Sequence, residues 1–203
     1  MARTPALIAV VIMALLCASC TSAGPPSTPS VPATASATTG STQVSSSAAP
    51  TATWSPEQAA ALLAVDGYRA ASDEIGANPA KFSEAQMRSM LKRWAGPEVV
   101  KSNVASFVAL KKRGFKYEIN TTVLTTKASR ASDVGYGTEV VVTRCIDQRP
   151  AKVLDKNGAE VSQEELGYRV PEFLLRQYTA QKRTADKTFL VYGLAPAKGE
   201  CGP

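Results

Sequence analysis

The stretch from Thr21 to Thr53 restricts the fold of this chain more than any other part of it. It consists almost wholly of Ser, Thr, Ala, Pro and Gly, and it contains no charged and no aromatic residue. Such a segment cannot bury enough apolar surface to offset the roughly 1–2 kcal/mol that ordering each backbone residue costs. We therefore predict a disordered tether over residues 20–53, which leaves residues 54–203 for one folded domain.

An uninterrupted apolar run lies ahead of this tether. Residues Ala6 to Leu16 contain no polar side chain, and Arg3 gives the segment before them a positive charge. A membrane-spanning helix needs about 20 apolar residues, so this run is too short to span and instead has the length of a secretory signal. The sequence therefore predicts that the chain is exported.

The residues from Leu16 to Cys20 resemble a lipobox, in which two small side chains precede the cysteine that becomes acylated. Ala18 and Ser19 fill the small positions, whereas the position before them holds a cysteine in place of the usual leucine. We predict a lipoprotein signal peptide over residues 1–19 and a lipid anchor, palmitate included, at Cys20. The protein would then sit on the extracytoplasmic face of the cell membrane. The alternative is an ordinary cleaved signal peptide and a secreted protein.

Helical signals open the folded part of the chain. Ser55, Pro56 and Gln58 combine an N-cap, a first-turn proline and a capping box. Apolar residues then recur at helical spacing up to Ile75. Gly67 counts against this helix by about 1 kcal/mol relative to alanine. Three helices are predicted: Ser55 to Gly76, Asn78 to Gly96, and Glu98 to Arg113.

From Phe115 onward the apolar period changes from helical to alternating, which is typical of strands. Helices followed by strands favour an α+β fold with the helices packed on one face of an antiparallel sheet. The predicted strands are about ten residues from Phe115 through Val123, then Thr138 to Ile146, Phe173 to Arg183 and Thr188 to Leu194, with turns at 135–137, 155–158 and 185–186.

Two cysteines remain after the signal region, Cys145 and Cys201. In an exported chain we predict that they form a disulfide, with two free thiols as the alternative. The bond would close a loop of roughly 57 residues and stabilise the fold by about 4 kcal/mol in the chain-entropy model. Two sulfurs and no histidine make an incomplete ligand set, so we predict no metal site and no cofactor.

Tyr68, the segment Val108 to Gly114 and the segment Val140 to Asp147 carry a resemblance. On these residues the folded part resembles the small lipoproteins of actinobacteria and their phages that have a nuclear transport factor two-like domain. The resemblance implies a single cone-like α+β domain, with helices curled inside a curved antiparallel sheet and an open-ended apolar pocket. Enzymes of that fold place Asp, His or Tyr in the cone, and this chain has no histidine for an Asp–His pair.

Three residues are candidates for such a pocket: Asp66, Tyr68 and Asp147. Tyr68 can equally pack in the core with its hydroxyl at the rim. Asp147 can act as a general base, or it can be a strand-end residue that bonds nearby backbone, as Asp does in turns. Arg144 and Arg149 flank Asp147 and can pair with it.

The basic run Lys111, Lys112 and Arg113 is a candidate contact for an anionic surface, either lipid headgroups or a wall polymer. The alternative is a solvated helix end, where cations before a glycine are common. Nucleic acid is not an expected partner, because the chain is exported and has no basic stripe with interleaved aromatic residues.

Two functions follow from these features. The first is a lipid-anchored binding module of the bacterial envelope that contacts an envelope protein, a wall polymer or a small apolar ligand. No catalytic residue is predicted, because histidine and phosphate-binding loops are absent from the sequence. The alternative is a small enzyme of the cone fold that acts on an apolar ligand with Asp and Tyr. A buried carboxylate with a raised pKa would favour the enzyme, and a pocket filled by side chains would favour the binding module.

Overall fold

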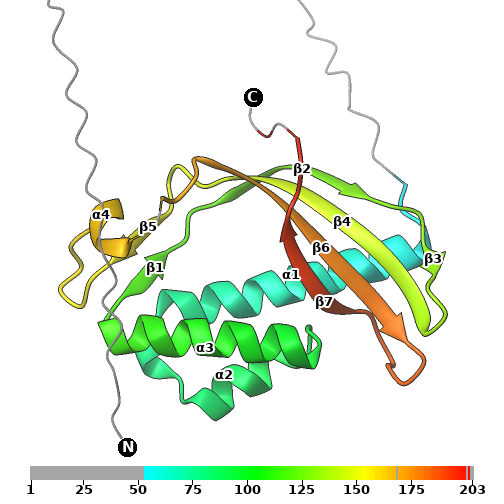
Figure 1. Ribbon diagram of the computed structural model, residues 1–203, viewed down its shortest axis with the longest axis horizontal. Helices are drawn as coiled ribbons and strands as arrows, with labels where there is room; N and C mark the ends of the chain where they lie inside the picture. Colours follow the sequence, from blue (N-terminus) through cyan, green and yellow to red (C-terminus); the bar gives the residue numbers. More distant parts are fainter. Residues whose placement is uncertain (1–52, 168, 200, 202–203) are drawn as a thin grey trace, which may run out of the picture. The chain divides into compact units, whose positions relative to one another are not determined.

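The computed structural model describes residues 53–167, 169–199 and 201 (Figure 1). The predicted signal peptide, Cys20 and all of the predicted tether except Thr53 lie outside these residues. Within the described part, the chain forms helices first and then a strand-rich half, so the predicted α+β class is confirmed. No helix among these residues is both long and apolar enough to cross a membrane.

Helix α1, Pro56–Ala77, begins as the sequence predicts. The Ser55 side chain accepts from the Gln58 backbone, and the Gln58 side chain accepts from the Ser55 backbone, which completes the capping box. Helix α3, Pro97–Arg113, ends at Gly114, whose φ of 71° is left-handed. The helices bury one apolar face each, which includes Ala61, Ala64, Val65, Tyr68 and Ile75 of α1 and Val100, Val104 and Phe107 of α3.

The helix predicted from Asn78 to Gly96 is wrong at both ends. Pro79–Lys81 forms a short 3-10 helix, η1, and helix α2 covers only Glu84–Leu91. A second capping box sets this start, because Ser83 and Gln86 exchange side-chain-to-backbone hydrogen bonds. The chain leaves α2 before Ala95, which forms a bridge with Val191.

The main sheet is antiparallel, with strand order β2-β4-β6-β7 and β3 paired to β4. Figure 1 shows it strongly curved, with α1 running along its concave side and α3 next to α1. The inward side chains Val140, Val142, Tyr178, Ala180 and Val191 pack on the helices in one core. The strands are β2 Thr122–Ala128, β3 Ser132–Asp133, β4 Gly137–Asp147, β6 Phe173–Arg183 and β7 Leu190–Pro196.

The single strand predicted from Phe115 is wrong, because the chain leaves one sheet and enters another. Strand β1, Lys116–Glu118, pairs with β5, Lys152–Leu154, whereas β2 pairs with β4. A one-turn helix, α4 at Gln163–Leu166, was not predicted. These pieces surround a second, smaller apolar cluster, formed by Leu110, Phe115, Val153, Val161 and Leu166.

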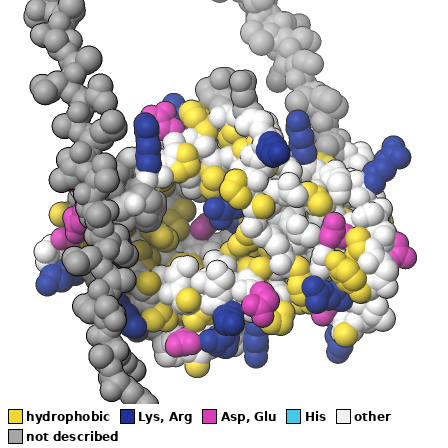
Figure 2. Space-filling model, viewed as in Figure 1, with side chains coloured by type: hydrophobic (Ala, Val, Ile, Leu, Met, Phe, Trp, Pro, Cys, Tyr) yellow, Lys and Arg dark blue, Asp and Glu magenta, His cyan; other side chains and the backbone are white. Residues whose placement is uncertain are grey.

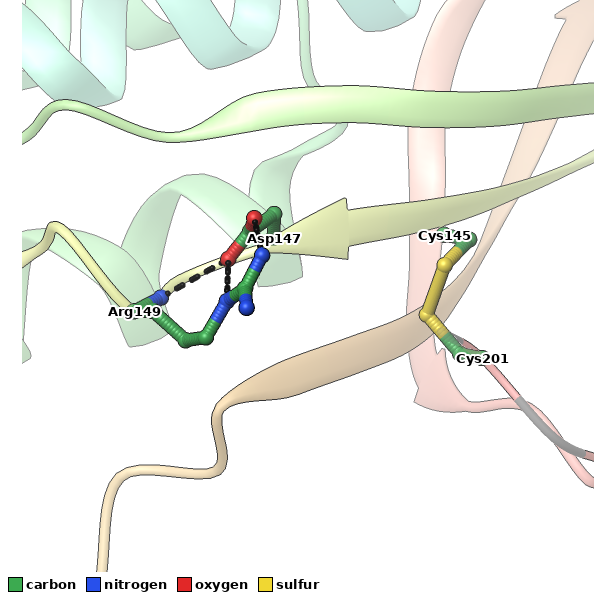
Figure 3. Close-up of polar contacts among 4 residues, drawn as sticks. All are labelled: Cys145, Asp147, Arg149 and Cys201. Carbon is green, nitrogen blue, oxygen red and sulfur yellow. Dashed lines mark hydrogen bonds and ion pairs between the residues drawn. A yellow bond between two sulfur atoms is a disulfide. The ribbon is translucent and has the colours of Figure 1, made fainter. Parts of the chain in front are cut away.

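Cys145 and Cys201 form the predicted disulfide, with their Cα atoms 5.4 Å apart (Figure 3). Side chains alternate along a strand, so Cys145 lies on the face of β4 opposite to its neighbours Arg144 and Ile146. The bond therefore holds the C-terminal tail against the face of the sheet that points away from the helices. The backbone N–H of Ala197 also donates to the carbonyl of Leu175, which fixes the same tail to β6.

Candidate functional site

A pocket of about 450 Å³ opens where the curved sheet, α1 and the β1–β5 pair meet. Figure 2 shows this face hollowed, with a basic and an acidic side chain at the bottom of the hollow. The volume lies in the range of small-molecule sites. Apolar walls come from Ile119, Ile146, Val153, Val161, Leu166, Val170 and Leu174.

Two tyrosines form part of the pocket lining. Tyr68 of α1 and Tyr178 of β6 meet edge to face, with ring centroids 6.4 Å apart. The Tyr68 hydroxyl donates to Asn103 Oδ1 at 2.9 Å, and Asn103 Nδ2 donates to the Val99 carbonyl at 2.8 Å. Burial raises the pKa of both tyrosines, so their hydroxyls stay protonated.

Ser72 lies one helical turn after Tyr68 and also lines the pocket. Its Oγ is buried and has no hydrogen-bond partner among the described residues. The Ser72 hydroxyl lies near that of Tyr68, but the two do not meet the geometry of a hydrogen bond. Buried hydroxyls in native proteins are usually bonded, so this one is a candidate donor to a ligand.

Three charged side chains line the pocket without full exposure: Arg69, Asp73 and Arg176. Arg69 Nη2 donates to Thr121 Oγ1 at 3.2 Å. Burial raises the pKa of the Asp73 carboxyl, and the positive charge of Arg69 partly offsets this shift. The pocket therefore holds a partly buried carboxylate beside its own cation.

The pocket contains only one of the residues that the sequence singled out for it. Tyr68 faces the pocket, whereas Asp66 and Asp147 are not among its lining residues. Asp66 is exposed on α1, and its Oδ1 accepts from Nη1 of buried Arg144 at 2.6 Å. Arg144 therefore pairs with Asp66 and not with Asp147, its neighbour in sequence.

Asp147 is a strand-end residue bonded to nearby groups. It accepts from the Arg149 backbone N–H at 3.0 Å and from Arg149 Nε and Nη2 at 3.0 and 2.7 Å (Figure 3). The Arg149 side-chain bonds hold the pKa of Asp147 below its ordinary value. A carboxylate held ionised and occupied in this way is a poor general base, so the geometry favours the strand-end interpretation over the catalytic one.

Two members of the basic run have partners within the fold. Lys111 Nζ donates to the Phe82 carbonyl at 2.9 Å, and Arg113 Nη2 donates to the Glu165 carbonyl at 2.8 Å. The Arg113 guanidinium also lies 4.4 Å from the centroid of the Phe115 ring. These side chains link the end of α3 to η1 and α4. Contact of Lys111, Lys112 and Arg113 with an anionic surface stays a prediction.

Arg69, Asp73 and Arg176 were not predicted from the sequence, although the sequence holds a signal for them. Asp73 follows Arg69 by four residues, as Ser72 follows Tyr68, so these pairs share neighbouring faces of α1. Arg176 precedes Tyr178 by two residues, which places both on the inward face of β6. Helical and strand periods thus point to these residues once Tyr68 and Tyr178 are known to face inward.

No family model matches the sequence, and no curated protein matches it. Among solved structures, the intermembrane space region of the chloroplast protein ARC6 is similar over 72% of this chain and 100% of its own. That likeness has 11% identity and a TM-score of 0.49. A de novo β-sheet design matches over 70% of this chain and 93% of its own, with 14% identity and a TM-score of 0.33. Neither likeness bears on the function of this chain, and the resemblance to actinobacterial lipoproteins stays a prediction.

Proposed function

We propose that this protein is a binding module of the bacterial envelope, anchored by lipid at Cys20, that takes a small ligand with an apolar body into the pocket. The pocket itself is the observation that supports the proposal. Its volume is about 450 Å³, and its walls are mainly apolar with a few polar groups gathered on α1 and β6. Such a combination is typical of sites that hold small molecules.

The polar groups of the pocket are held in place by the protein. Tyr68 is fixed by Asn103, and Arg69 is fixed by Thr121. A ligand therefore meets side chains that are already ordered, and less conformational entropy is lost on binding. The sequence features at Cys20 and in the predicted tether support the envelope location, because they describe an exported chain with an acylation site.

One observation favours a second candidate, an enzyme acting on an apolar ligand. Asp73 is a partly buried carboxylate with a raised pKa, and Tyr68 lines the same pocket. A carboxyl group tuned in this way is a common general acid or base. The enzyme hypothesis therefore moves from Asp66 and Asp147 to Asp73, with Tyr68 retained.

The binding proposal is tested with the neutral apolar fluorophore N-phenyl-1-naphthylamine. We expect its fluorescence to rise on binding to the full chain, and we expect Leu174→Trp to abolish the rise because the indole fills the pocket. Leu63→Trp is the matched control, since Leu63 is 63% exposed on α1 and does not line the pocket. Equal binding by the two variants would contradict the proposal.

The enzyme alternative needs a different measurement. Lipid extract from the envelope is incubated with wild-type protein or with Asp73→Asn, and each mixture is analysed by mass spectrometry. A binding module returns the extract unchanged with either protein. A product that wild type forms and Asp73→Asn does not would favour the enzyme.

A further inference from the structure

We infer that the ligand of this pocket is an amphipathic anion, with its anionic head at Arg176 and its apolar body along the outer wall. The inference rests on the proposed binding function and adds the chemical class of the ligand. It is carried by an unpaired arginine inside the pocket and by the order of side chains along β6.

Arg69 and Arg176 are the two partly buried arginines of the pocket, and only Arg69 has a hydrogen-bond partner among the described residues; Arg169 also lines the pocket but is exposed. Arg176 is only partly exposed, yet within residues 53–167, 169–199 and 201 its guanidinium forms no hydrogen bond and no ion pair. Two arginines of the neighbouring strand β4 and its end do have carboxylate partners, Arg144 in Asp66 and Arg149 in Asp147. A guanidinium offers five N–H donors, and burying it without an acceptor is costly. A carboxylate or phosphate ligand would supply the missing acceptor in bidentate geometry.

The other charges of the pocket leave this arginine available. Lys152 and Glu160 form an ion pair at 3.0 Å, and both side chains are largely exposed at the rim. Asp73 lies next to Arg69, whose charge acts on its carboxyl. A cationic ligand would have to compete with Arg69 for Asp73 and would be repelled by Arg176. An anionic ligand meets a cation that nothing else engages.

Neutral donors lie on the same side of the pocket as Arg176. The buried Ser72 hydroxyl has no partner in the described part of the chain. Tyr178, two residues along β6 from Arg176, keeps its hydroxyl protonated because burial raises its pKa. Both hydroxyls can donate to an anion, so the head group would find donors from α1 and β6 together.

The order of inward side chains on β6 gives the ligand a direction. Of the β6 side chains that line the pocket, Tyr178 is the most buried at 3% exposed, Arg176 follows, and Leu174 comes next toward the start of the strand. Leu174 is opposite Ile146 of β4, and both line the pocket. Val170 and Pro171 continue this apolar wall beyond the strand. The head would therefore lie inside and the apolar body would extend toward the mouth.

The inference is tested with four amphiphiles that share a ten-carbon chain: decanoate, decyl phosphate, decanol and decylamine. Binding is measured at pH 7 by displacement of N-phenyl-1-naphthylamine from the full chain carrying Cys20→Ala, so that no lipid of its own competes. We expect at least one of the two anions to bind about tenfold or more tightly than decanol, as a charge-assisted pair to arginine gives, and decylamine to bind worst. The ranking of decanoate against decyl phosphate shows whether a fatty acid or a phosphate monoester is the better fit.

Arg176→Gln should remove the preference for the anion while decanol binds as before. Arg130→Gln is the matched control, because Arg130 is exposed and does not line the pocket. The ratio of anion to decanol affinity is compared within each variant, so a general loss of folding does not imitate the effect. The inference would be overturned if wild type bound the anions and decanol with about equal affinity, or if Arg176→Gln left the ratio of these affinities unchanged. The binding function would stand in either case. Failure of the fluorophore and of all four amphiphiles to bind wild type would contradict both.

Discussion

At the scale of single residues, the buried arginine Arg144 shows how a charge is tolerated inside the sheet. Its side chain is 6% exposed and sits on the inward face of β4, between Val142 and Ile146. Asp66 reaches it from α1 while remaining 60% exposed to solvent. The ion pair thus ties the helix to the sheet, and its carboxylate keeps most of its hydration.

Asp66→Asn should lower the free energy of unfolding by about 1 kcal/mol, because the buried guanidinium loses its charged partner but keeps a hydrogen-bond acceptor. Urea unfolding at pH 7 measures the change. Glu74→Gln, an exposed position on the same helix, is the control and should have little effect. Equal midpoints for the two variants would show that the pair contributes nothing to stability.

Asp73→Asn should change the free energy of unfolding in the opposite direction to Asp66→Asn. The pKa of Asp73 is raised in the folded protein, so the ionised carboxylate costs stability at any pH above that raised value. This cost disappears as the pH falls below 3.8, the ordinary pKa of an aspartate, because the Asp73 carboxyl is then protonated in the unfolded chain as well. Asp73→Asn should therefore stabilise the protein at pH 7, and the gain should shrink toward pH 4. Urea midpoints at both pH values check this, and a gain that grows on acidification would contradict it.

The sequence predicted single residues well where a local rule applied to them. The disulfide followed from two cysteines in a chain that is predicted to be exported, and Tyr68 followed from its place on an amphipathic face. Asp66 lies about two helical turns before Asp73 on nearly the same stripe of α1, so its distance along the helix, and not its face, keeps it away from the pocket. Asp147 lies on the face of β4 opposite to its neighbour Ile146, which does line the pocket. Only the packed structure shows that Asp73 lies at the pocket.

At the scale of elements, close helix packing explains Gly67, which the sequence analysis counted as a defect of α1. A Cβ at this position would lie 2.3 Å from Trp94 Cδ2, so the missing side chain gives the indole its place against the helix. Gly96 has the same role beside Tyr192, where a Cβ would lie 2.5 Å from the ring. Both glycines serve the packing between elements and cannot be judged from helix propensity alone.

Gly67→Ala should therefore destabilise the protein by about 1–3 kcal/mol, as overpacking does, although helix propensity alone predicts a gain of about 1 kcal/mol. Ala70→Gly is the control, because Ala70 is exposed on the same helix and should lose about 1 kcal/mol in the ordinary direction. Thermal unfolding of both variants measures the difference. A more stable Gly67→Ala protein would show that Trp94 moves aside at no cost.

The capped start of α1 was predicted from the sequence, whereas the capped start of α2 at Ser83 and the changes of partner strand were not. Ser55 and Gln58 mark the start of α1 in the sequence and in the structure alike. The alternation from Phe115 to Val123 is continuous in sequence, yet β1 pairs with β5 and β2 pairs with β4. Pairing depends on distant segments, so local alternation cannot reveal the break at residues 119–121.

At the scale of the whole molecule, the pocket results from the incomplete overlap of two apolar clusters. The main core joins α1 and α3 to the sheet, and the smaller cluster joins the end of α3 to β1, β5 and α4. Tyr117 packs against both clusters and lines the pocket between them. The charged and hydroxyl side chains of the pocket lie in this space, which the apolar side chains of the two clusters do not fill.

The whole-molecule prediction concerns the anchor at Cys20. If Cys20 is acylated, Cys20→Ala should abolish labelling by a fatty-acid analogue, and the protein should stay as unprocessed precursor or pass into the medium. Cys17→Ala is the matched control and should keep the label, because Cys17 leaves with the signal peptide. A predicted tether of about 33 residues would span on the order of 30 Å, enough to hold the pocket clear of the headgroups. Equal labelling of wild type and Cys20→Ala would refute the anchor, and the pocket would then belong to a protein held in the envelope by other means or released from it.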